Sequence, residues 1–288
     1  MVRFKVVKGG TLLLAAALVL LLAVVCVILF SSRSSDSGKA SAAVFAAQET
    51  VAVENEHSDA VADITTEFLP ARDIKSVLIY HTHTHEAYQP ADGDDYEALE
   101  AWRTDDNEHN VVRVGEELAA SLREYGLQVC HDTTDHEQDD LSTSYSRSLE
   151  TLNGYSDQKF DLYIDLHRDA YADGAQLTCA YQGTDSAKLM VLIGKGDAFA
   201  QKPDFEANYT LASKLTAAVN DLCPGLCRDV MVKTGRYNQH VSSHSLLIEV
   251  GNNRNTLEEA LCSVPVLAQA ISNVLTDDPV SGVAFASK

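Results

Sequence analysis

Three histidines and a glutamate lie close together in residues 76–88, which read SVLIYHTHTHEAY. His81, His83 and His85 stand at alternate positions, and Glu86 follows them. Imidazole and carboxylate groups are common zinc ligands, and a catalytic zinc site takes three protein ligands. The run therefore predicts part of a metal site whose other ligands come from elsewhere in the chain.

The histidine run follows a predicted strand. Residues 76–80 are rich in β-branched and aromatic side chains, which is typical of a buried strand. In an extended chain, residues i and i+2 face the same way, so this strand would present several imidazoles at its carboxyl end. In open α/β sheets, that edge is where ligand sites form.

Two more apolar segments carry polar side chains at the same point. FDLYIDLHRD (160–169) ends with His167 and Arg168, and SLLIEVG (245–251) contains Glu249 near its end. Taken alone, His167 fits a hydrogen-bonded core residue and Glu249 fits the partner of an arginine. However, a glutamate in a buried strand is costly unless it is paired or functional. Three such strand ends together indicate a mononuclear metal hydrolase.

The remaining segments alternate between strand-like and helix-like patterns. This alternation predicts an α/β fold, a single three-layer domain with a mostly parallel twisted sheet and helices on both faces. Residues 172–187, with two glycines, favour a hairpin or a loop insertion. Thr256 and Glu259 fit a capping box at the start of the last helix. Further strands are expected at 127–130 and 189–193, and helices at 111–125, 142–152, 209–222 and 256–274.

The N-terminal region predicts a membrane anchor. Residues 12–30 are all apolar, close to the roughly 20 residues that span a bilayer. Three basic residues precede them, which keeps the N-terminus in the cytoplasm. A cleaved signal peptide would have a shorter apolar core and a small-residue cleavage site, and neither is present. We therefore expect a single-pass protein of the cell membrane with an extracytoplasmic domain, divided as follows: cytoplasmic N-terminus and transmembrane helix 1–30, flexible linker 31–70, catalytic domain 71–277 and tail 278–288.

Composition narrows the class of partner. The chain has 288 residues, 45% of them hydrophobic, and a net charge of −20. So acidic a chain argues against nucleic acid as a partner and against docking on anionic lipid. The cysteines form no paired CxxC motifs, which argues against a zinc ribbon. Cys223 and Cys227 could close a small disulfide, but the odd number of cysteines outside the apolar run favours buried thiols.

Nine segments in order make residues 75–275 resemble the stage II sporulation protein P family, cell-wall lytic proteins of endospore-forming bacteria. The N-terminal anchor fits the same family. One departure is Cys227, where a small polar residue is expected. The segments are IYHTHTHEAY (79–88), NVVRVGEEL (110–118), HDTTD (131–135), YSRS (145–148), IDLHRD (164–169), PGLCR (224–228), GRYNQH (235–240), LLIEVGNN (246–253) and NTLEEA (255–260).

That family is similar to the zinc-dependent N-acetylmuramoyl-L-alanine amidases, and the resemblance implies the site residues. Zn²⁺ would be held by His83, Glu86 and His167, with Glu249 as the catalytic residue. The wider amidases place the ligand glutamate just before the first long helix, which would suggest Glu108 instead of Glu86. The family favours Glu86, the residue close to the first histidine. The resemblance further implies that four residues bind substrate or orient the ligands: His81, His85, Arg168 and Asn238.

The implied reaction is cleavage of the amide between N-acetylmuramic acid and L-alanine in peptidoglycan. The family is also associated with cleavage of peptide cross-links, and with septal thinning and engulfment alongside stage II sporulation proteins D and M. A metallo-β-lactamase-like site would need an Asp-His pair after His-x-His, and an amidohydrolase barrel would need about 250 residues. A non-catalytic peptidoglycan-binding scaffold is the other alternative, but the presence of both histidines and of Glu249 argues against it.

Overall fold

A computed structural model describes residues 74–276 of the protein, apart from 92, 94, 139 and 171–176. The predicted membrane helix, the linker and the C-terminal tail lie outside these residues. The anchor, the topology and the domain limits therefore stay predictions.

A six-stranded sheet forms the centre of the fold, in the order β2-β1-β3-β8-β6-β7. The first four strands of that order are parallel to one another, which confirms a mostly parallel α/β sheet. The strands are β1 (Ser76–Tyr80), β2 (Gln128–His131), β3 (Leu162–Asp169), β6 (Leu189–Gly194), β7 (Met231–Lys233) and β8 (Ser245–Asn252).

Strand β6 runs antiparallel to β8 and parallel to β7, so the sheet is mostly but not wholly parallel. Between β3 and β6 the chain forms the hairpin of β4 (Thr178–Tyr181) and β5 (Thr184–Ala187). The hairpin itself agrees with the prediction for this segment.

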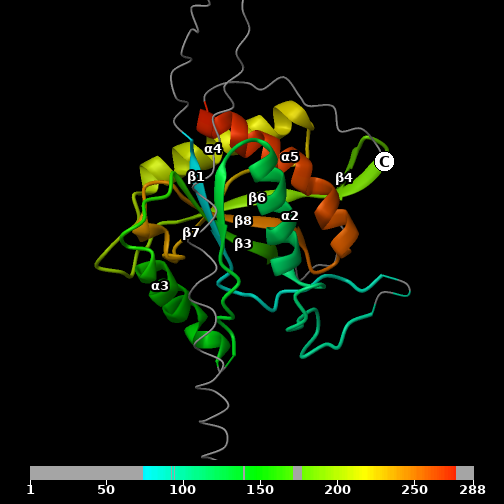
Figure 1. Ribbon diagram of the computed structural model, residues 1–288, viewed down its shortest axis with the longest axis horizontal. Helices are drawn as coiled ribbons and strands as arrows, with labels where there is room; N and C mark the ends of the chain where they lie inside the picture. Colours follow the sequence, from blue (N-terminus) through cyan, green and yellow to red (C-terminus); the bar gives the residue numbers. More distant parts are fainter. Residues whose placement is uncertain (1–73, 92, 94, 139, 171–176, 277–288) are drawn as a thin grey trace, which may run out of the picture. The chain divides into compact units, whose positions relative to one another are not determined.

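Helices cover both faces of the sheet (Figure 1). In β1, Val77 and Ile79 point into the main core under α2, α4 and α5, whereas Leu78 and Tyr80 pack with Leu152 of α3 on the opposite face. This alternation follows from the period of two in a strand and produces the three predicted layers. The helices are α2 (Val111–Glu124), α3 (Ser144–Gly154), α4 (Phe205–Leu222) and α5 (Leu257–Thr276), with short 3₁₀ turns η1 (Leu141–Thr143) and η2 (Gln239–Val241).

Helix α5 begins with the predicted capping box. The Thr256 hydroxyl accepts from the Glu259 backbone N–H at 3.2 Å, and the Glu259 carboxylate accepts from the Thr256 N–H at 3.1 Å. By length and composition α5 could cross a membrane, but half of its apolar window is buried. Val264, Leu267 and Ile271 lie in the main core. These contacts favour a core helix.

The five cysteines in the described part of the chain have free thiols. Cys223 Sγ lies 3.9 Å from Cys179 Sγ. The pairing of Cys223 with Cys227, one of the two alternatives from the sequence, is therefore absent from the described part of the chain.

Candidate active site

Two neighbouring strands bring His167 and Glu249 together. His167 of β3 pairs in register with Glu249 of β8, so their side chains lie side by side on the α3 face. Both residues are buried, and His167 Nε2 and Glu249 Oε2 have no hydrogen-bond partner. Nε2 does lie 2.8 Å from Asp165 Oδ1, but the contact is not aligned as a hydrogen bond. Unpartnered buried polar atoms are rare and point to a ligand or a catalytic role.

Glu86 reaches the same point from the segment that follows β1. Its Oε2 lies 3.2 Å from His167 Nδ1 and accepts from the Arg168 backbone N–H at 3.1 Å. Burial raises the pKa of Glu86, but the opposing effect of His167 and Arg168 together is larger and lowers the pKa to about 2. Glu86 is therefore ionised at neutral pH. Glu108, the alternative ligand, is exposed in the turn before α2 and lies outside the residues that line the site.

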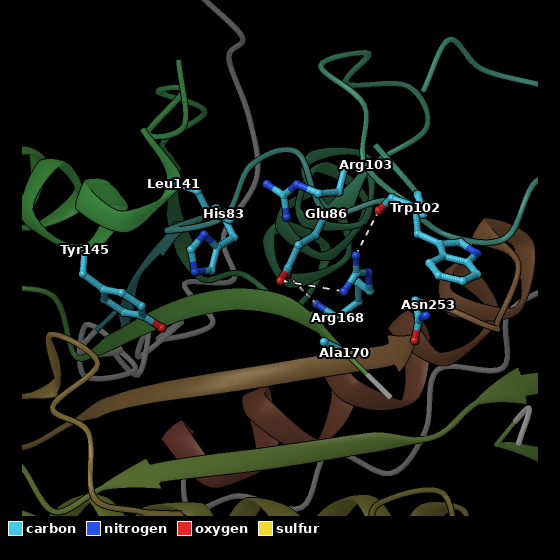
Figure 2. Close-up of a pocket in the computed structure, with 10 residues that line it drawn as sticks. His83, Glu86, Trp102, Arg103, Leu141, Tyr145, Arg168, Ala170 and Asn253 are labelled. Atoms are coloured by element: carbon cyan, nitrogen blue, oxygen red, sulfur yellow. Dashed lines mark hydrogen bonds and ion pairs between the residues drawn. The ribbon is translucent and has the colours of Figure 1, made fainter. Parts of the chain in front are cut away.

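His83 completes the group. Its ring centre lies 5.4 Å from that of His167. Its Nδ1 is 2.7 Å from Glu137 Oε1, an arrangement that leaves Nε2 as the atom able to bind a ligand. Figure 2 shows the His83 ring between Tyr145 and Glu86.

His83 and Glu86 line a cavity of about 590 Å³, and the buried His167 and Glu249 lie behind this lining. The cavity lies at the carboxyl ends of the parallel strands, where sites form in α/β folds. It is lined by His83, Glu86, Ala101, Trp102, Arg103, Leu141, Tyr145, Arg168, Ala170 and Asn253 (Figure 2).

The charges at the site suit a cation. Burial lowers the pKa of His167, but Asp165 and Glu86 raise it well above its usual range, so positive charge is favoured between the two carboxylates. Two imidazoles and a carboxylate are also the donor set of many catalytic zinc sites. As placed, no three His, Cys, Asp or Glu side chains in the described residues have the geometry of an ion site. The donors therefore fit zinc by their chemistry, and the ion itself is a proposal.

Glu249 has the environment of an acid–base group. Burial raises its pKa, His167 and Arg168 lower it, and Glu86 and Asp169 raise it, with a net value of about 8. A carboxyl group with a pKa near the working pH can both accept and release a proton.

With the geometry described, comparison with known proteins identifies the family. The family model for "Stage II sporulation protein P (SpoIIP)" matches residues 31–272. The chain belongs to this family.

A relative named stage II sporulation protein P, from Bacillus subtilis (strain 168), is 28% identical over 223 residues. The match covers 71% of this chain and 52% of the relative, so the chain spans about half the length of that protein.

Three solved structures are similar at TM-scores below 0.5, too low to support an argument about activity. The catalytic domain of the CD27L endolysin, which targets Clostridia difficile, is 15% identical, with a TM-score of 0.45 and coverage of 72% of this chain and 99% of that one. An N-acetylmuramoyl-L-alanine amidase from Clostridium difficile 630 is 15% identical, with a TM-score of 0.45 and coverage of 71% and 96%. The amidase AmiC2 of Nostoc punctiforme is 16% identical, with a TM-score of 0.42 and coverage of 70% and 96%.

In this SpoIIP family member the three histidines of the run point to three different places. His81 turns toward α2, with Nδ1 2.9 Å from the Leu166 carbonyl and Nε2 2.9 Å from His131 Nε2. His85 Nε2 lies 3.0 Å from Asp135. The predicted common face is therefore wrong, because β1 ends at Tyr80 and the alternation of an extended strand ends with it.

Arg168 is bonded to the backbone around the cavity. Its Nε donates to the Ala87 carbonyl and its Nη2 to the Trp102 carbonyl, both at 2.9 Å. These bonds hold two backbone segments beside the cavity together. The remaining guanidinium nitrogen, Nη1, lies 3.9 Å from Glu86. The position fits a residue that orients the site.

The Asn238 side chain also links two elements by hydrogen bonds. Its Nδ2 donates to the Tyr145 carbonyl at 2.8 Å and to Ser148 Oγ at 3.0 Å. The side chain thereby fixes the loop before η2 against α3.

Two further buried acids lie at the site, and no sequence motif singles them out. Glu137 bonds His83 and also accepts from the His85 N–H at 2.8 Å and from Arg103 Nη2 at 2.5 Å. Asp165 accepts from the Thr82 N–H at 2.8 Å and from its hydroxyl at 2.7 Å. Asp165 stands two residues before His167, so its place on the same strand face could have been predicted.

Proposed function

We propose that the chain is a zinc-dependent peptidoglycan hydrolase that cleaves the amide between N-acetylmuramic acid and L-alanine during sporulation septal thinning and engulfment. The observation that carries the proposal is that Glu249 is buried beside His167 and has a pKa of about 8. Family membership supports the sporulation setting. Hydrolysis of peptide cross-links by the same site is part of the proposal.

His83, Glu86 and His167 would hold the zinc ion. When bound, zinc polarises the scissile carbonyl and lowers the pKa of water to about 7. Glu249 takes the proton from the attacking water and gives it to the leaving nitrogen. Glu137 keeps His83 in the tautomer and orientation that the reaction requires.

Glu249→Gln tests the assigned chemistry. The amide keeps the size of the side chain but cannot accept the proton, so hydrolysis should fall by about 10²–10⁴-fold while zinc remains bound. The measurement is digestion of purified peptidoglycan by the full-length protein in detergent, with products identified by mass spectrometry and zinc by elemental analysis. Glu150→Gln, an exposed change on α3, is the matched control.

The products separate the alternatives. Free stem peptides mean an amidase, and split cross-links mean an endopeptidase. No products from a zinc-loaded wild-type protein would favour the scaffold. Release of stem peptides by Glu249→Gln at the wild-type rate would contradict the role of Glu249.

His83→Ala should lose zinc, and an unchanged zinc content would reject His83 as a ligand.

The membrane anchor at 12–30 and the partnership with stage II sporulation proteins D and M complete the proposal. Wild-type protein should stay in the membrane pellet after alkaline carbonate extraction, and a chain without residues 1–30 should be released. Release of both chains would rule out the anchor.

Failure of proteins D and M to co-purify with the tagged full-length chain from sporulating cells would argue against the partnership.

A further inference from the structure

A second cavity, of about 340 Å³, adjoins the candidate active site. Tyr145 of α3 lines both cavities, so a ligand in the first can continue into the second. The second cavity is lined by Tyr145, Ser146, Leu149, Phe199, Gly235, Arg236, Tyr237 and Asn238. None of its residues has a role in the chemistry proposed above.

Three aromatic side chains, Tyr145, Phe199 and Tyr237, contribute to the wall of this second cavity. The rings of Tyr145 and Tyr237 meet edge to face, with centroids 5.8 Å apart. The Arg236 guanidinium lies over the Phe199 ring, 4.4 Å from its centroid, although Phe199 is 42% exposed. Aromatic walls with a few polar groups are typical of small-ligand sites.

The backbone holds Tyr237 in a costly conformation. Tyr237 and Asn238 both have φ of +50°, a region that side chains larger than glycine rarely adopt. A Cβ at Gly235 or Gly194 would come within 2.8 Å of the Tyr237 ring, so both positions require glycine. Strained residues fixed by their surroundings concentrate at ligand sites.

From this cavity we infer a sugar-binding subsite: it seats one N-acetylated pyranose ring of the glycan strand among Tyr145, Phe199 and Tyr237. The inference rests on the proposed function, since it extends the same substrate beyond the scissile amide. Aromatic faces pack against the C–H faces of a pyranose, and Arg236 can bond its oxygen atoms. A stem peptide, with its several carboxylates, would need more cations than Arg236, the one cation among the described residues that line this cavity.

Binding of a peptide-free tetramer of N-acetylglucosamine tests the subsite. This probe contains no muramoyl–alanine amide, so its binding does not depend on hydrolysis. Isothermal titration of the full-length protein in detergent should show binding by the wild type and by Glu249→Gln. Phe199→Ala and Tyr237→Leu should each weaken the affinity at least tenfold. Tyr209→Ala removes an equally exposed aromatic ring outside both cavities and should bind as the wild type does.

The thermal midpoint of each variant shows whether it is folded, and Phe199→Ala, at an exposed position, keeps the test valid if Tyr237→Leu unfolds. Tetramer binding that is absent, or unchanged in folded Phe199→Ala, overturns the inference. So does a free stem peptide that binds the wild type and loses affinity in the same variants. A protein that binds the tetramer in this cavity but leaves peptidoglycan uncut refutes the proposed function and retains the subsite.

Discussion

At the scale of the residue, each proposed zinc ligand is held in place by only a few hydrogen bonds. His83 is oriented by one carboxylate, Glu137, at 2.7 Å. Glu137 is held in turn by the His85 N–H and by Arg103. Burial raises the pKa of Glu137, but the bond from His83 and its other neighbours lower it overall, so the carboxylate stays ionised at neutral pH. This is the carboxylate–histidine arrangement that supports metal ligands.

Glu137→Gln should therefore weaken zinc binding by about 10–100-fold. Glutamine keeps the shape but loses the charge and one of the two acceptor oxygens that His83 and Arg103 share. Zinc affinity measured by competition with a chelator checks this, with Glu150→Gln as the control. Equal affinity in Glu137→Gln and the wild type would mean that His83 needs no such support.

At the scale of the element, α2 lies close to the sheet because Gly115 has no side chain. A Cβ there would come 2.6 Å from Nε2 of His81 and 2.6 Å from Nε2 of His131. These two rings join the ends of β1 and β2 under the helix. Glycine inside a helix costs about 1 kcal/mol relative to alanine, so the close approach accounts for its presence.

Gly115→Ala should destabilise the fold by about 1–3 kcal/mol, because the added methyl group must displace the two rings or the helix. Gly154→Ala is the matched change on α3, where nothing lies within 4 Å of the new Cβ, and it should be neutral or stabilising by up to about 1 kcal/mol. Urea unfolding followed by circular dichroism measures both. A Gly115→Ala variant as stable as Gly154→Ala would contradict the packing argument.

At the scale of the whole molecule, buried histidines make stability depend on pH. Burial, followed by the charge of His131, lowers the pKa of His81 to about 3, and burial lowers that of His131 to about 4. In the unfolded chain both imidazoles take up protons below about pH 6.5, whereas in the folded chain the same two imidazoles stay neutral until the pH is much lower. The contribution of these two imidazoles to stability is therefore complete above pH 6.5, and it is lost as the pH drops from 6.5 toward about 3–4.

His131→Asn should make this loss smaller, because one of the two neutral imidazoles is gone. The free energy of unfolding at pH 7 and at pH 4.5 gives the loss for each variant. The exposed His244→Asn should lose as much as the wild type. An equal loss in His131→Asn would show that other groups set the acid sensitivity.

Much of the architecture was predictable from the chain. Buried strands are short apolar runs, and the segments 76–80, 160–169 and 245–251 agree within a few residues with β1, β3 and β8. The capping box of α5 is a local pattern and was confirmed. The meeting of His167 and Glu249 also follows, since parallel strands end at one edge.

Other features depended on contacts between distant segments. The turn after Tyr80 determines which histidine faces the cavity. The path of the chain after β1 places Glu86 beside His167 and leaves Glu108 exposed. The direction of β6 depends on its pairing with β8, and the support of His83 by Glu137 joins residues 54 positions apart. The amino-acid sequence by itself determined which residues could do chemistry and the strand ends that carry them, because those patterns are local. Only the tertiary structure decided where each side chain points, because that depends on neighbours far away in the chain.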